Sequence, residues 1–354
     1  GQRYGDQPFF LNQGAVVSYG ELDLRSGQYA KGFAELGLAQ GDRVAVMLDN
    51  CAEYLYAWFG ASKAGMIEVS INTSFKGTIL RYILDNCGCS AIVVGAQYLD
   101  VVAAELEALP ELKTLINIGD CERQSIDGLA NRKVVNVTSF NDLDSASPCA
   151  SPVDIAVLGY TSGTTGPSKG AMLTHNRIVK TGQQMAIVRG VGAEDNLYSC
   201  LPLFHGNAKF VTVMPALVMG ARTSIGQRFS ASQFWSELHS VGATQYNYLG
   251  VMISVLLKQA PSPDDRAHNA RLGWGAGALK EMVPIFEERF GTFLVEGYGL
   301  TEGGIALSNT RDERRLGSCG KPMPGYEADV VDEWDNPVKP NEQGELVIRS
   351  RWPH

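Results

Sequence analysis

An apolar run at 155–159 is followed by the segment Tyr160-Thr161-Ser162-Gly163-Thr164-Thr165-Gly166-Pro167-Ser168-Lys169-Gly170. It holds five serine or threonine hydroxyls, three glycines and one lysine. Glycines let the backbone approach a ligand closely, hydroxyls and amides donate hydrogen bonds, and Lys169 neutralises negative charge. The pattern predicts a polyphosphate-binding loop between a strand and a helix that begins near Thr174. A flexible Gly/Ser linker is the alternative, but the lysine, the proline and the preceding strand argue against it.

Upstream of this loop, apolar runs of strand length alternate with amphipathic helical segments. A capping box at Ser18 and Glu21 opens the first helix, and Gly37 ends it. The expected strands are 44–48, 67–71, 91–94 and 114–118, and the expected helices are 50–63, 78–86 and 99–108. Such alternation is typical of a parallel, doubly wound sheet. Residues 119–153 lose the periodicity and end in a Ser/Pro-rich run, which indicates a connection between two lobes.

Downstream of residue 153 a second α/β series is expected. Its strands are predicted at 155–159, 197–201, 222–225, 244–248, 272–275 and 293–296, and one helix is predicted to start at Ser230. After residue 308 the helical pattern fades into short strands between turns. The predicted fold class is α/β, with two doubly wound sheets flanked by helices in αβαβα layering and a small, partial β subdomain. The predicted domains are 1–153, 154–307 and 308–354.

Composition excludes several classes of protein. The 354 residues include 30 Lys and Arg against 38 Asp and Glu, a net charge of −8, which argues against nucleic acid as a partner. The longest apolar run, 210–221, is shorter than the roughly 20 residues of a membrane-spanning helix. The seven cysteines form no CxxC pair, so neither a disulfide framework nor a zinc site is indicated. We expect a cytoplasmic protein, and the sequence does not indicate its oligomeric state.

Two further glycine-rich segments follow expected strands. The first is Gly273-Trp274-Gly275-Ala276-Gly277-Ala278 and the second is Glu296-Gly297-Tyr298-Gly299-Leu300-Thr301-Glu302-Gly303-Gly304. Neither fits the GxGxxG dinucleotide spacing. Small residues let a flat ring lie against the backbone, Tyr298 can stack on a base, and Thr301 and Glu302 can meet phosphate and Mg²⁺. Packing turns with a solvated Glu302 are the alternative.

His205, one of five histidines, lies just past an expected strand end. It is either a satisfied structural residue or part of a substrate site. The surrounding residues form no catalytic triad, and residues 159–163 are not a GxSxG elbow.

Taken in this order, the segments resemble the adenylate-forming superfamily of acyl-CoA synthetases, beetle luciferases and nonribosomal peptide adenylation domains. The 160–170 loop and the Gly297–Glu302 segment match the family's motifs, and 317–325 and 344–348 look like its next two blocks. The resemblance spans essentially the whole chain, and 229–271 look most like the carnitine-CoA ligase branch.

This resemblance implies roles for individual residues. The β- and γ-phosphates of ATP would be held by Thr161, Ser162, Gly163, Thr164, Thr165 and Lys169. Adenine would be held by Gly275, Ala276, Gly277, Glu296, Gly297 and Tyr298, while Thr301 would touch the α-phosphate and Glu302 the Mg²⁺. The acyl pocket would be lined by His205, Trp274 and Gly299. The implied catalytic residues are Lys169, Thr301, Glu302 and His205.

The implied reaction joins a small carboxylic acid to coenzyme A at the expense of ATP. The carboxylate attacks the α-phosphorus, pyrophosphate leaves, and the coenzyme A thiol captures the acyl-adenylate. Family members continue into a ribose-binding aspartate motif and a mobile domain with a catalytic lysine, which the sequence does not reach before His354. We therefore expect a large domain without its lid, impaired in catalysis. A catalytically incompetent nucleotide- or acyl-binding module or scaffold is the alternative, and the acid is not indicated.

Overall fold

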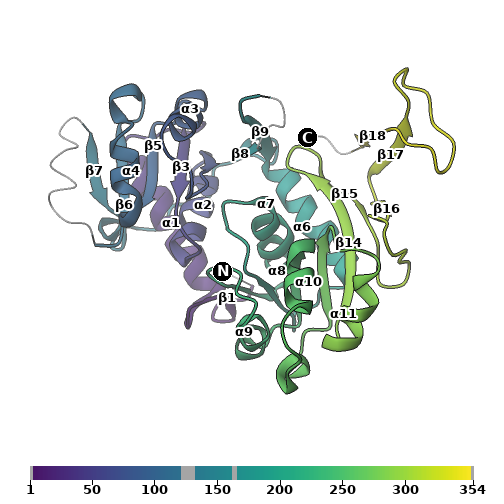
Figure 1. Cartoon of the computed structure of the whole chain (residues 1–354). Coiled ribbons are helices and arrows are strands. Elements are labelled where there is room, and N and C mark those ends of the chain that lie inside the picture. The colour runs from purple at the N-terminus through teal and green to yellow at the C-terminus, as the bar shows by residue number, and fades with distance from the viewer. Residues whose placement is uncertain (1–2, 121–131, 162–165, 352–354) are drawn as a thin grey trace. The chain divides into compact units, whose positions relative to one another are not determined.

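A computed structural model of the chain describes residues 3–120, 132–161 and 166–351 (Figure 1). The chain forms two compact units. The first comprises Gly1–Ile178, Cys200–Lys209 and Ile225–Arg228, and the second comprises Val179–Ser199, Phe210–Ser224 and Phe229–His354. Both units are discontinuous in sequence, and the first runs past the boundary expected after residue 153.

The first unit contains a seven-stranded sheet in the order β7-β6-β5-β3-β4-β8-β9. Its strands are β3 (Arg43–Met47), β4 (Ile67–Ser70), β5 (Ala91–Gly95), β6 (Thr114–Ile118), β7 (Lys133–Asn136), β8 (Ile155–Thr161) and β9 (Lys169–Thr174). All neighbours are parallel except β8 and β9, which form an antiparallel hairpin. A second antiparallel hairpin, β1 (Pro8–Asn12) and β2 (Ala15–Ser18), precedes the sheet in the chain.

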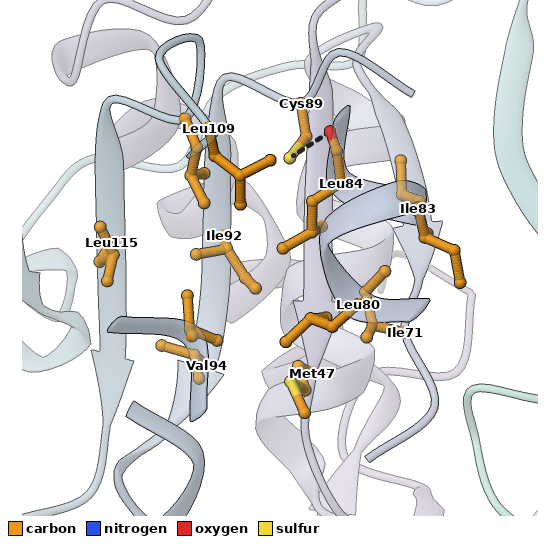
Figure 2. Close-up of a cluster of buried hydrophobic side chains, with 14 of the residues drawn as sticks. Met47, Ile71, Leu80, Ile83, Leu84, Cys89, Ile92, Val94, Leu109 and Leu115 are labelled. Carbon is orange, nitrogen blue, oxygen red and sulfur yellow. Dashed lines mark hydrogen bonds between the residues drawn. The ribbon is translucent and has the colours of Figure 1, made fainter. Parts of the chain in front are cut away.

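Helices cover both faces of this sheet. Successive strand residues point to opposite faces, so strands that are apolar throughout must be covered on both sides. Within its described residues the unit has the helices α1 (Tyr19–Glu35), α2 (Ala52–Lys63), α3 (Thr78–Asn86), α4 (Leu99–Ala103) and α7 (Gly206–Ala208). On one face Met47, Ile71 and Ile92 pack against Leu80 and Leu84 of α3 in one continuous apolar core (Figure 2). On the other face α2 is tied to β4, where the Tyr54 hydroxyl donates to Glu68 at 2.9 Å.

In the second unit the strand order is β16-β15-β14-β13-β12-β10-β11. These strands are β10 (Asn196–Ser199), β11 (Arg222–Ile225), β12 (Gln245–Leu249), β13 (Leu272–Ala276), β14 (Phe293–Leu300), β15 (Gly304–Ser308) and β16 (Lys321–Pro322). Strands β10 and β12, β12 and β13, and β13 and β14 pair in parallel, whereas β15 returns antiparallel to β14. The remaining helices are α6 (His175–Arg189), α8 (Met214–Met219), α9 (Phe234–Val241), α10 (Gly250–Leu257) and α11 (Met282–Phe290). A separate antiparallel pair, β17 (Tyr326–Val331) and β18 (Glu345–Ser350), follows them.

The predicted α/β class with parallel sheets flanked by helices is confirmed, and α3 and β11 match the expected ranges to the residue. Two local predictions were wrong, and one strand, β9, was missed although the helix expected near Thr174 begins at His175 as α6. β8 was expected in the second series, but it pairs with β4 and belongs to the first sheet. An apolar run alone does not reveal which sheet a strand joins. The phosphate loop leads into β9 before α6 begins. The helix expected from Ser230 starts at Phe234, because Ser230 instead closes a turn by accepting from the Gln233 amide at 3.1 Å.

Candidate functional site

The predicted phosphate loop connects the two strands of the β8–β9 hairpin. Thr161 and Lys169 are the last cross-strand pair before it. Lys169 is exposed, and among the described residues its ammonium has no hydrogen-bond or ion-pair partner. The predicted ligands Ser162, Gly163, Thr164 and Thr165 lie outside the described residues. The hairpin therefore presents a lysine ammonium beside a hydroxyl-rich loop.

Two tyrosine hydroxyls, one from α3 and one from β8, anchor the hairpin to α3. The Tyr82 hydroxyl donates to the Ser168 carbonyl at 3.1 Å, and the Tyr160 hydroxyl donates to Asn86 Oδ1 at 2.6 Å. Gly170 makes room for this second contact, because a Cβ there would lie 3.2 Å from Tyr160 Cζ. Burial raises the pKa of Tyr160, so its hydroxyl keeps the proton that it donates. Both ends of the loop are thus fixed to one helix.

His205 lies in the first unit, just before the short helix α7. Its Nδ1 accepts from the Asn207 amide at 3.2 Å, so the neutral imidazole carries its hydrogen on Nε2. The residue is solvent-exposed, but surrounding protein desolvates the ring enough to lower its pKa. His205 therefore offers an uncharged Nε2–H donor at neutral pH.

The two glycine-rich segments of the second unit lie next to each other toward the carboxyl ends of its parallel strands. β13 and β14 are parallel, and their last paired position is Gly275 with Glu296, near the carboxyl end of β13. Open parallel sheets place their ligands at this edge. Ala276 and Gly277 are exposed there, whereas Gly275 is buried and its absent Cβ would lie 2.2 Å from the Tyr248 carbonyl oxygen.

The Glu296 carboxylate closes the turn that follows β13. It accepts from the Ala278 amide at 2.8 Å, and the Gly277 amide also donates to it. Burial raises the pKa of Glu296, and these backbone bonds lower it by less. Gly277 has φ +81°, a conformation that favours glycine. Glu296 thus holds a left-handed turn in place and leaves the backbone of the turn exposed.

The segment expected as a glycine-rich turn after β14 is itself strand. Gly297 pairs with Ser308 and Leu300 with Gly304, so the turn is restricted to 301–303. Tyr298 and Glu302 are exposed and Thr301 is half-buried. Within the described residues the Glu302 carboxylate has no ion-pair partner.

The glycines of this hairpin are required by packing. A Cβ at Gly297 would lie 2.6 Å from Trp274 Cζ2, and one at Gly299 would lie 2.5 Å from the Gly304 carbonyl oxygen. Trp274 itself is buried, and its Nε1 donates to Ser308 Oγ at 3.2 Å. The Trp274 ring packs in an apolar cluster with Met185 and Val295.

The structure thus groups the predicted residues by unit. Thr161, Lys169 and His205 belong to the first, and the segments around Trp274, Glu296 and Glu302 belong to the second. The sequence did not single out Tyr82 and Asn86, although their four-residue spacing places both on one helix face. Among described residues, no three His, Cys, Asp or Glu side chains gather into a metal site. No helix in the described ranges combines the length and apolar character needed to cross a bilayer.

Comparison with known proteins places these motifs in a family. The family model of the AMP-binding enzymes matches residues 1–353. A crotonobetaine/carnitine–CoA ligase of Salmonella heidelberg (strain SL476) is 32% identical over 362 residues, covering 98% of this chain and 68% of the relative.

Solved structures share the fold at lower identity. An anthranilate CoA ligase, AuaEII, in complex with anthranoyl-AMP superposes with a TM-score of 0.89 at 23% identity, covering 98% of this chain and 67% of the other. A benzoate CoA ligase from Burkholderia xenovorans LB400 gives 0.88 at 22% identity, with coverage of 98% and 69%. These identities establish the fold alone, whereas the family match and the curated relative establish kinship. The chain belongs to the AMP-binding enzyme family of the adenylate-forming superfamily, and its class is that of an AMP-forming acid–thiol ligase.

Proposed function

We propose that this chain activates a carboxylic acid with ATP and transfers the acyl group to coenzyme A. One observation carries the assignment of ATP: an exposed lysine and a hydroxyl-rich loop lie at the tip of a hairpin that α3 fixes on both sides. A lysine on a hairpin held in this way suits phosphoryl chemistry, since groups that need no reorganisation stabilise developing charge most effectively.

Lys169 neutralises the β- and γ-phosphates in this proposal. Thr161, Ser162, Gly163, Thr164 and Thr165 supply hydroxyl and amide donors around them. The leaving group of the first step is pyrophosphate, so the loop holds the atoms on which charge accumulates as the bond breaks. Thr301, in the turn of the β14–β15 hairpin, contacts the α-phosphate.

Adenine binds at the carboxyl edge of β13 and β14. The exposed backbone of Ala276 and Gly277 faces the base and Tyr298 stacks on it. Gly275, Glu296 and Gly297 support this surface, because the Glu296 carboxylate fixes the turn and the two glycines allow close strand packing.

Mg²⁺ binds through Glu302 and the phosphates. Mg²⁺ prefers oxygen ligands and is usually held by one or two carboxylates together with substrate phosphates. An exposed Glu302 with no ion-pair partner in the described part of the chain fits such a site. The ion neutralises phosphate charge when it is bound.

His205, Trp274 and Gly299 line the acyl site. A carboxylate oxygen attacks the α-phosphorus, the bond to the β-phosphate oxygen breaks, and acyl-AMP and pyrophosphate form. The coenzyme A sulfur then attacks the acyl carbonyl, AMP leaves, and the thiol proton passes to solvent. The relatives named above point to carnitine, crotonobetaine, anthranilate and benzoate as acids to test. A cytoplasmic location stays a prediction.

Mass spectrometry of quenched reactions tests the proposal. We expect ATP, Mg²⁺ and one acid of a panel containing carnitine, crotonobetaine, anthranilate, benzoate and a fatty acid to give the matching acyl-AMP. Lys169→Ala should give much less product. Binding of ATP without acyl-AMP from any acid would instead favour a catalytically incompetent nucleotide-binding module.

A further inference from the structure

A buried ion pair in the first unit lies four residues after His205. The Lys209 ammonium is 2.6 Å from Glu68 Oε2 and 2.8 Å from Ser70 Oγ. The two charged side chains are 1% and 0% exposed, respectively. Glu68 and Ser70 both belong to β4 and point to the same face of the sheet.

Helix α2 completes the surroundings of this pair. The Tyr54 hydroxyl donates to Glu68 Oε1 at 2.9 Å, and the Lys209 ammonium lies 4.9 Å from the ring centroids of both Tyr54 and Trp58. The ammonium therefore has an ionic partner, a hydroxyl partner and two aromatic faces. Its position is defined from several directions by the central sheet of the unit.

A second buried polar contact fixes the other side of the same segment. Asn50, just past the end of β3, accepts from the Leu203 amide at 2.7 Å and donates to the Leu201 carbonyl at 3.2 Å. The Lys209 amide donates to the His205 carbonyl at 3.3 Å. His205 thus lies between two attachments to neighbouring strands, Asn50 on one side and the Glu68–Lys209 pair on the other.

Stability alone does not explain a buried pair of charges. Desolvation of a lysine and a glutamate offsets much of their attraction, and apolar residues of similar volume are often as stabilising or more so. An apolar pair, however, is non-directional, whereas a hydrogen-bonded pair specifies one position for the segment that carries it.

We propose that Glu68 and Lys209 are positioning residues that hold the 201–209 segment, and with it the Nε2–H donor of His205, in place at the acyl site. The inference rests on the assignment of His205 to that site in the proposed function. Neither residue touches the reacting atoms.

Hydrogen exchange followed by mass spectrometry tests, without substrate, whether the Glu68–Lys209 pair holds the 201–209 segment in place. Lys209→Met leaves the buried Glu68 carboxylate without its positive partner, so it should lower the melting temperature. The double variant Glu68→Leu/Lys209→Met removes both charges and should recover most of that loss. Amides of 201–209 should nevertheless exchange at least about tenfold faster in the double variant than in the parent, while amides of β5 and β6 stay unchanged.

A matched control is the Asp23–Lys63 pair, which has the same 2.6 Å separation but is more exposed. Asp23→Leu/Lys63→Met should leave exchange at 201–209 unaltered. Parent-like exchange at 201–209 in the Glu68→Leu/Lys209→Met variant would overturn the positioning role, because the segment would then hold its place without the pair.

Steady-state kinetics with the acid that yields acyl-AMP separate this inference from the proposed function. The double variant should raise KM for the acid by about 10- to 100-fold and change KM for ATP by less than about twofold. His205→Ala should do the same. If His205→Ala leaves KM for the acid unchanged, the assignment of His205 fails. If it raises that KM while the double variant does not, only the positioning role fails.

Discussion

The hairpins β8–β9 and β14–β15 carry similar glycine-rich sequences for different physical reasons. At Gly166, in the first, an added Cβ would meet no described atom within 4 Å. At Gly297, in the second, it would meet Trp274 Cζ2 at 2.6 Å and the Leu307 carbonyl oxygen at 2.9 Å. Gly166 in the first hairpin is thus not required by packing against described atoms, whereas Gly297 in the second is needed by the core.

This difference separates ligand contacts from support in each hairpin. The first presents Lys169 to solvent and is held by the α3 contacts of Tyr82 and Tyr160. The second is integrated into its sheet, so only exposed positions such as Tyr298 and Glu302 are available to a nucleotide. Substitution of Lys169 should therefore affect binding, whereas substitution of Gly297 should affect folding.

The largest effect is expected from Lys169→Ala, which tests the first half of the comparison. Loss of one charge-assisted contact to phosphate is worth roughly 1.5–3 kcal/mol, or about 10- to 150-fold in affinity for Mg·ATP. The melting temperature should not change, because this ammonium has no partner among the described residues. Titration calorimetry provides the affinity, and Lys258→Ala, at another exposed lysine, is the control. Equal affinities for Lys169→Ala and Lys258→Ala would remove the phosphate-loop assignment.

Gly297→Ala tests the second half and should give a somewhat smaller effect. The added methyl collides with a buried tryptophan, and overpacking of this kind typically costs about 1–3 kcal/mol of stability. Thermal melts should show a clear decrease for Gly297→Ala and almost none for Gly166→Ala. If both variants melt like the parent, packing does not explain the glycines of the second hairpin.

Glu296→Gln should give the smallest effect, visible as a change in pH dependence. Burial raises the pKa of Glu296 above its ordinary 4.5, so the folded state binds a proton more tightly than the unfolded state. The resulting stabilisation is complete below about pH 4.5 and is lost as the pH rises through the folded pKa. A glutamine keeps an oxygen that accepts from Ala278 but does not titrate. Melting temperatures measured from pH 4 to 8 should therefore fall less steeply for the variant, and parallel curves would contradict this account.

Local sequence patterns were sufficient for much of the fold. Ser18 is the N-cap of α1, with its hydroxyl accepting from the Glu21 amide at 3.0 Å, but the Glu21 carboxylate accepts from the Tyr56 hydroxyl at 3.1 Å. The bounds of α3 are as predicted. The strand predicted at 272–275 is also present, as β13 (Leu272–Ala276). β9 was missed because its glycine and its exposed Met172 disrupt any alternation of polar and apolar residues.

Long-range partners could not be predicted from the sequence. Lys209 and Glu68 are far apart in the chain, and nothing local to either residue indicates that they pair. Likewise the sequence marked Glu296 as a ligand contact, and only the folded backbone shows that its carboxylate accepts from Ala278. Contact of adenine with the turn at 276–278 stays a prediction.

Acid-dependent ATP–pyrophosphate exchange is the decisive test of acid activation by this chain, because it reports reversible formation of acyl-AMP without coenzyme A. With labelled pyrophosphate, Mg·ATP and one acid from the panel, we predict label in ATP that depends on the acid and is strongly reduced in Lys169→Ala. No exchange with any acid, from a protein that binds ATP and melts cooperatively, would contradict the assignment as an acid-activating enzyme.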